Sequence, residues 1–152
     1  MLRQQLNDAL KEAMKAKQHR AVSTLRLILA ALKDRDIANR TEGVDDVGIG
    51  EDQILWLLQS MIKQRRDSIE AYIKGGRQEL ADGEAEEIEI IRRFLPEQMD
   101  EDALADAVGQ IIAEAGASGI KDMGNVMGLL REKYAGQMDF GKASAMVKAR
   151  LG

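Results

Sequence analysis

The chain contains one proline, Pro96, among 152 residues whose apolar side chains otherwise recur at helical spacing. Proline has no amide hydrogen to donate, and its ring pushes the preceding residue out of the α region. A helix is predicted over Glu84–Leu95, because Ile88, Ile91 and Leu95 share one face and acidic residues occupy the other. This helix must end near Leu95, so Pro96 divides the chain into two helical parts.

A new helix start follows the proline within a few residues. Asp100 is a suitable N-cap, and Glu101 and Asp102 complement the helix dipole in the first turn. Met99 and Leu104 are spaced for a hydrophobic staple across that start. We therefore predict two domains, over residues 1–95 and 97–152.

Apolar periodicity predicts seven helices. In the first part they span Leu2–Lys17, Arg20–Ala38 and Glu51–Lys74, and a fourth helix runs from beyond Gly75-Gly76 to Leu95. Thr41–Gly50 is predicted to be a loop. In the second they span Asp100–Ala115, Ile120–Ala135 after a Ser118 cap, and a last helix from an Asp139 cap to Leu151. The predicted fold is all-α: a four-helix unit with a long antiparallel hairpin, then a small three-helix unit.

Composition excludes several classes of protein. The chain has no cysteine, so it has no disulfide framework, thiolate zinc site or cysteine nucleophile. No apolar run approaches the roughly 20 residues that span a bilayer, and the first residues form an amphipathic pattern instead of a signal peptide. These features predict a cytoplasmic protein with no membrane association, no metal and no cofactor.

Charge is unevenly distributed along the chain. Residues 1–40 hold nine Lys and Arg against four Asp and Glu, residues 41–102 hold seven against seventeen, and residues 103–152 hold six against five. The two ends of the chain would therefore attract a polyanion, and the acidic middle would repel it. Solvated helix faces with an accidental imbalance explain the same counts.

Four features invite a functional reading but also have a structural one. His19, the single histidine, suits a proton shuttle or an exposed helix end. The eight methionines suit a peptide groove or ordinary core packing. Four acids lie close together and could ligate a metal or form a solvated helix face: Glu84, Glu86, Glu87 and Glu89. The basic segment Lys63-Gln64-Arg65-Arg66 could contact a binding partner, or Asp67 and Glu70 could neutralise it within the same helix. We favour the structural reading of each.

The segment Lys121–Gly136 is more informative. Gly124 and Gly128 stand four apart within a predicted helix, where each costs about 1 kcal/mol relative to alanine. Either another helix packs closely against them or a ligand backbone approaches them. Residues 118–152 also carry six basic residues against three acids, which makes this face locally cationic.

The chain resembles the YqeY family of small bacterial proteins over essentially its full length. The matching segments are Ser23–Ile28, Lys63–Ile69, Glu87–Ile91, Phe94–Gln98, Gly116–Ser118 and Lys121–Gly124, together with Gly128, Gly136 and Asp139. Their order and spacing carry the resemblance.

The last 55 or so residues also resemble the C-terminal tail domain of the GatB subunit of the glutamine-dependent tRNA amidotransferase. That tail shares the pattern formed here by Lys121, Gly124 and Gly128, followed by Gly136. In that enzyme the chemistry lies in other domains and the tail helps to hold the tRNA. This chain departs from the tail at Arg131-Glu132-Lys133 and at Met138-Asp139-Phe140.

The resemblance implies a non-catalytic tRNA-binding or tRNA-handling accessory protein without a catalytic residue of its own. The residues implied for RNA contact are Lys121, Gly124, Gly128, Arg131, Lys133, Gly136 and Lys142. One alternative is a helical adaptor that docks on an amidotransferase or a synthetase. Another is carbon–nitrogen ligase activity with glutamine as amide donor, which ranks last because the chain has no phosphate-binding glycine loop and no assembled nucleophile.

Overall fold

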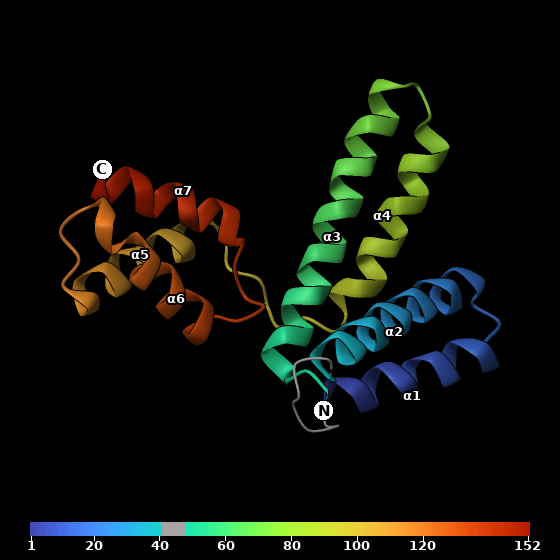
Figure 1. Ribbon diagram of the computed structural model, residues 1–152. Coiled ribbons are helices and arrows are strands. Elements are labelled where there is room, and N and C mark those ends of the chain that lie inside the picture. Colours follow the sequence, from blue (N-terminus) through green and yellow to red (C-terminus); the bar gives the residue numbers. More distant parts are fainter. Residues whose placement is uncertain (41–47) are drawn as a thin grey trace. The chain divides into compact units, whose positions relative to one another are not determined.

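The computed structural model describes residues 1–40 and 48–152. The described residues form helices, turns and short connections without a strand, which confirms the all-α prediction (Figure 1). The chain divides into two compact units, Met1–Leu95 and Pro96–Gly152. That these units act as separate domains stays a prediction. Residues 41–47 of the predicted loop Thr41–Gly50 lie outside the described part of the chain.

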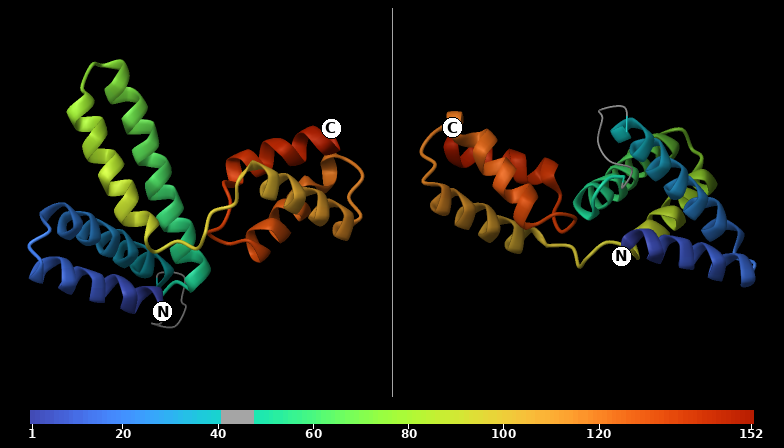
Figure 2. Two further views of the ribbon diagram at one scale, coloured as in Figure 1. Left: turned by 180° about the vertical axis from the view of Figure 1, so that it is seen from behind. Right: turned by 60° about the horizontal axis from the view of Figure 1, so that its bottom comes forward.

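The described residues of the N-terminal unit form four helices. They are α1 (Leu2–Lys15), α2 (His19–Arg40), α3 (Glu51–Lys74) and α4 (Gln78–Arg92). Helices α3 and α4 lie side by side as an antiparallel hairpin, and α1 and α2 form a second antiparallel pair (Figures 1 and 2). The buried residues of α3 all lie in its first half, between Ile54 and Ile62, so the far half of the hairpin is only two helices thick.

The end of α1 explains why the first helix is shorter than predicted. The Lys17 amide donates to the Met14 carbonyl, and the Gln18 amide donates to the Ala13 carbonyl, which is the Schellman arrangement. Lys17 consequently adopts a left-handed conformation with φ of 57°. The same arrangement ends α3, but there the left-handed position is occupied by Gly76, with φ of 73°.

Two ion pairs hold the helices of the N-terminal unit in register. The Arg3 guanidinium donates to both carboxylate oxygens of Asp36 at 2.7 Å, which joins α1 to α2. It also donates to the Ile49 carbonyl, whose residue precedes α3. In the hairpin, Arg65 Nε of α3 lies 3.1 Å from Glu87 Oε2 of α4, and both side chains are at most 15% exposed. The hairpin is therefore joined by a partly buried ion pair as well as by apolar packing.

The C-terminal unit packs three helices around its own core. They are α5 (Glu101–Ala115), α6 (Met123–Lys133) and α7 (Phe140–Leu151), with a 3₁₀ turn, η1 (Ile120–Asp122), directly before α6. Val108, Ile111, Val126, Leu130, Met138 and Val147 are the largest fully buried side chains of this unit. The predicted N-caps are confirmed, since Asp100 accepts from the Ala103 amide and Asp139 from those of Gly141 and Lys142.

The predicted Ser118 cap is wrong. The Asp122 carboxylate accepts hydrogen bonds from the Ser118 amide at 3.0 Å and from the Gly119 amide at 3.3 Å. These bonds tighten the start into the 3₁₀ turn, so the α-helix begins at Met123 instead of Ile120. It also ends earlier than predicted, at Lys133.

The segment around Pro96 makes distinct contacts on its two sides. Helix α4 ends at Arg92, three residues earlier than predicted, because Phe94 and Leu95 bond to carbonyls only three residues back. After the proline, the Met99 amide donates to the Gln137 carbonyl at 2.8 Å, and the Gln98 side-chain amide donates to the Gly136 carbonyl at 2.6 Å. Residues 98 and 99 thus belong structurally to the turn between α6 and α7.

We expect Lys17→Gly to raise the free energy of unfolding by about 1 kcal/mol, because glycine adopts a left-handed conformation without steric cost. Urea unfolding followed by circular dichroism measures the change. The reverse substitution in the equivalent position, Gly76→Lys, should lower the stability. A destabilised Lys17→Gly variant would contradict this account of the α1 terminus.

We expect Glu87→Ala to lower the free energy of unfolding by about 2 kcal/mol, because Arg65 loses its partner in a partly buried site. Glu89→Ala is the matched control: its pair with Arg92 is exposed, and its removal should change stability by less than about 0.5 kcal/mol. Equal effects of the two variants in thermal unfolding would show that burial does not distinguish the pairs.

Candidate nucleic-acid interface

The two helical glycines of α6 face open space within their unit. Gly124 and Gly128 are both exposed, and a Cβ added at either position would meet no described atom within 4 Å outside its immediate helical surroundings. Close packing within the C-terminal unit therefore does not explain them. Of the two explanations drawn from the sequence, the approach of an external partner is the one that this geometry favours.

Two cations flank these glycines. Gly124, Gly128 and Arg131 follow one another at intervals of four and three residues and so share one face of α6. Lys121 lies three residues before Gly124, in the 3₁₀ turn η1. Lys121 and Arg131 are exposed, and neither forms an ion pair with another described residue. We refer to these four residues as the glycine stripe.

Lys133 and Lys142 lie elsewhere on the unit. The Lys133 ammonium lies 3.8 Å from the Glu114 carboxylate and 5.6 Å from the centre of the Tyr134 ring. The Lys142 ammonium lies 3.8 Å from the carboxylate of Glu101. These acids stand near opposite ends of α5, about 20 Å apart at the helical rise. The structure therefore does not bring Lys133 and Lys142 together, and each has an acidic neighbour.

Gly136 shapes the turn after α6. It is buried and has φ of 75°, a conformation that side chains with a Cβ rarely adopt. Its carbonyl accepts the hydrogen bond from Gln98 described above. Gly136 thus holds the α6–α7 turn on the segment that follows Pro96 and is not part of the exposed stripe.

Asp122 is a site residue that the sequence analysis assigned no role. Its two backbone hydrogen bonds, led by that from Ser118, lower the pKa of its carboxyl group, and the nearby Lys121 charge acts in the same direction. The ionised carboxylate fixes the turn that presents Lys121 and offsets part of that lysine's charge. The aspartate three residues after Gly119, directly before a helix, was the available sequence indication.

The remaining candidates take structural positions. His19 is exposed at the first position of α2, as expected of a helix-end histidine. Arg65, from the basic step of α3, is used in the hairpin ion pair. The acids of α4 are not simply a solvated face: Glu86 pairs with Arg20, Glu87 with Arg65 and Glu89 with Arg92. The residues that the structure describes contain no group of three acids or histidines arranged to hold a metal ion.

None of the described helices has both the length and the apolar character needed to cross a bilayer. The longest, α3, carries charged residues along its second half.

Curated proteins similar to this chain occur in yeasts. The chain is 34% identical over 90 residues to "Altered inheritance of mitochondria protein 41, mitochondrial" of Lachancea thermotolerans, a match that covers 59% of this chain and 46% of the relative. The proteins of the same name from Kluyveromyces lactis and Saccharomyces cerevisiae strain YJM789 are 30% and 29% identical, with 59% of this chain and 45% and 46% of the relatives covered. The chain thus spans about half the length of the curated relatives it matches.

The names of these relatives place them in mitochondria, which contradicts the prediction of a cytoplasmic protein. That prediction was made from the absence of cysteine, the absence of long apolar runs and the amphipathic pattern of the first residues. These features do not distinguish one reducing aqueous compartment from another.

A family model described as "Yqey-like protein" matches residues 3–151. The match extends from the second residue of α1 to the end of α7, on both sides of Pro96, and it agrees with the resemblance noted in the sequence. The chain belongs to the Yqey-like protein family.

Proposed function

We propose that this protein is a non-catalytic tRNA-binding accessory protein that contacts RNA through the glycine stripe of its C-terminal unit. The observation that carries the proposal is the exposure of Gly124 and Gly128 in a helix that would be more stable with alanine at both positions. An external partner that approaches the α6 backbone explains why glycine, and not alanine, occupies these two positions. The resemblance of this unit to an amidotransferase tail that holds tRNA supplies the kind of partner.

The charge distribution determines how such binding would work. The protein has a net charge of −4 and only 3% aromatic residues, so neither broad cationic attraction nor base stacking can supply much affinity. The unpaired cations Lys121 and Arg131 suit two phosphate contacts. Between them, a helix surface without side chains suits the shallow minor groove of an RNA duplex, where backbone and 2′-hydroxyl groups are accessible. Recognition would then depend on RNA shape.

No catalytic role is part of the proposal. The amidotransferase resemblance is confined to the tail, whose chemistry is supplied by other domains in that enzyme. The alternative of a carbon–nitrogen ligase would need a nucleophile and a phosphate site, and the sequence provides neither pattern. Release of ammonia from glutamine by the pure protein would contradict this assignment.

We expect Lys121→Glu/Arg131→Glu to abolish binding of labelled deacylated tRNA, because both phosphate contacts become repulsive. The wild-type affinity should be micromolar or weaker and should fall about tenfold between 50 and 200 mM salt, as two counterions released would require. Fluorescence anisotropy at the two salt concentrations measures both effects.

The matched control is Lys133→Glu/Lys142→Glu, which makes the same change in net charge outside the stripe. It should retain most of the wild-type affinity. If both double variants lose binding equally, overall charge and not the stripe governs the interaction.

We expect Gly124→Ala/Gly128→Ala to be more stable than wild type by about 1–2 kcal/mol, because both positions are helical and have room for a methyl group. The same variant should bind tRNA at least about tenfold more weakly, because the methyl groups hold the RNA away from the α6 backbone. Thermal unfolding and anisotropy measure the two effects on one sample. A stabilised variant with unchanged affinity would remove the main support for the proposal.

A further inference from the structure

The methionines of this protein are concentrated in one of its two cores. Five of the eight belong to the apolar cluster of the C-terminal unit: Met99, Met123, Met127, Met138 and Met146. The larger cluster of the N-terminal unit contains one among its described residues, Met61. The proposed RNA contact uses none of these side chains, so their distribution needs a separate explanation.

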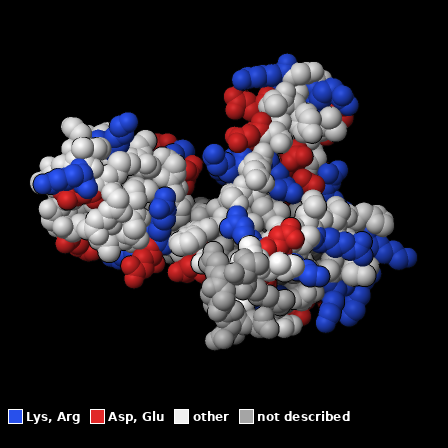
Figure 3. Space-filling model, viewed as in Figure 1, with Lys and Arg blue, Asp and Glu red and all other residues white. Residues whose placement is uncertain are grey.

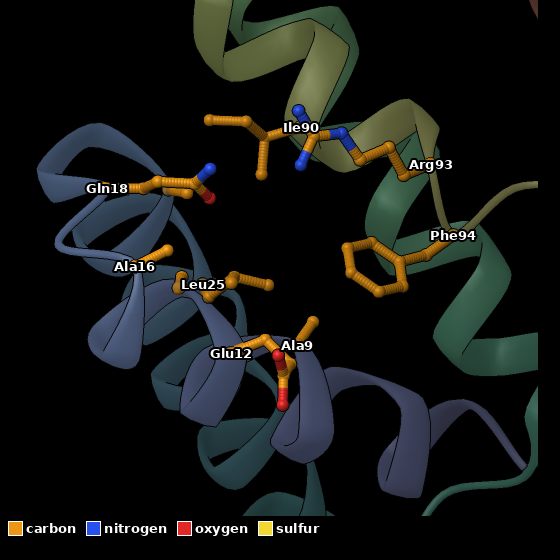
Figure 4. A pocket seen from close by; sticks show the side chains of 10 residues that line it. Ala9, Glu12, Ala16, Gln18, Leu25, Ile90, Arg93 and Phe94 are labelled. Atoms are coloured by element: carbon orange, nitrogen blue, oxygen red, sulfur yellow. The ribbon is translucent and has the colours of Figure 1, made fainter.

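The N-terminal unit shows that helix packing in this protein does not depend on methionine. Its buried core consists mainly of leucine and isoleucine. Even where this core is open to solvent, in a hollow between α1, α2 and the end of α4, no lining side chain contains sulfur (Figure 4). The remaining methionines, Met1 and Met14, are at least 50% exposed and lie outside the core. A thioether-rich core is therefore particular to the C-terminal unit.

Three methionines of the C-terminal core are within reach of solvent. Met99, Met123 and Met146 are half-buried, and each packs against the buried residues of the core. They lie before α5, at the start of α6 and in α7, and we refer to them as the accessible methionines. Met127 and Met138, by contrast, are 5% and 1% exposed. A small dissolved oxidant therefore meets sulfur at three places around this core while the unit is folded.

We propose that the C-terminal unit is a peroxide-sensitive switch, which loses its packed core when the accessible methionines are oxidised. In each step the thioether sulfur attacks one oxygen of hydrogen peroxide, the O–O bond breaks, an S–O bond forms and the peroxide is reduced to water. The chain has no cysteine, so methionine is its only sulfur-containing residue. The sulfoxide is polar where the thioether was apolar, and it disrupts the packing around it.

The small size of the unit makes it sensitive to this change. A domain of about 60 residues buries only about 60% of the surface that its unfolded chain exposes, so its stability is marginal. The unit Pro96–Gly152 has this size and a core of its own. A sulfoxide at the edge of that core either loses its hydration or moves out to solvent, and both responses weaken the core. The N-terminal unit has only Met61 in its core, at 7% exposure, and should not respond.

The chemistry also provides a return path. Methionine sulfoxide reductases, one for each sulfoxide epimer, restore the thioether. With dithiothreitol as reductant, the oxygen leaves as water and the dithiol becomes a disulfide. Because α6 begins at Met123 and carries the glycine stripe, loss of the core would also remove the surface assigned to RNA. This last consequence rests on the proposed function, whereas the switch itself does not.

Hydrogen–deuterium exchange of the full-length protein, measured by mass spectrometry before and after mild treatment with hydrogen peroxide, tests the proposal. We expect amides of α5, α6 and α7 to exchange at least about tenfold faster after oxidation, and amides of α3 and α4 to be unchanged. Peptide mapping should find sulfoxide at the accessible methionines before it appears at Met127 and Met138. Both sulfoxide reductases with dithiothreitol should restore the original exchange.

Met99→Leu/Met123→Leu/Met146→Leu removes the accessible thioethers and nearly conserves side-chain volume. We expect the same peroxide treatment to leave its exchange unchanged. Met14→Leu/Met61→Leu, with both substitutions in the N-terminal unit, is the control and should respond as the wild type does. If the triple variant does not fold, the order of oxidation and the exchange of the wild-type protein still decide the question.

Three results would overturn the proposal. The first is unchanged exchange in α5, α6 and α7 once the accessible methionines carry sulfoxide. The second is oxidation of Met127 and Met138 as early as that of the accessible methionines. The third is equal acceleration of exchange in the triple variant and the wild type. None of these measurements contains RNA, so a failure of the untreated protein to bind tRNA would contradict the proposed function alone.

Discussion

The missing amide hydrogen of Pro96 is the constraint on which the organisation of the chain depends. Before it, α4 tightens into three-residue hydrogen bonds and ends at Arg92. After it, Gln98 and Met99 donate to the turn between α6 and α7, and Asp100 caps α5. Each side of the proline is thus bound to a different hydrophobic core, and few residues remain that belong to neither.

Helical glycines serve two different purposes in this protein. Gly83 of α4 is buried beneath Arg20, whose Nη1 would lie 2.9 Å from an added Cβ, so this glycine makes room for a guanidinium within the fold. Gly124 and Gly128 of α6 are exposed and make room for nothing in their own unit. The same residue type therefore supports packing in one helix and leaves a surface bare in the other, where the cost to helix stability calls for an external partner.

The net charge of −4 does not show which charged residues form ion pairs and which do not. Many acids are held in pairs, such as Asp36 with Arg3 and Glu87 with Arg65, and these pairs join helices within the N-terminal unit. Figure 3 shows Lys and Arg side chains at the surface of both units. Cations without a described acidic partner occur on both units, among them Lys121 and Arg131 beside the stripe glycines and Arg66 and Arg93 on the N-terminal unit.

The sequence by itself determined the helices, both ends of α3 and the caps at Asp100 and Asp139, because these depend on hydrogen bonds and spacing within a few residues. It also indicated the residues of the glycine stripe, since they lie within eleven consecutive residues of η1 and α6. Only the tertiary structure decided that Lys133 and Lys142 have acidic neighbours, that Glu87 faces inward, and that Phe94 and alanines of α1 line one open hollow. Those features join residues far apart in the chain, and local periodicity carries no information about which helix faces meet.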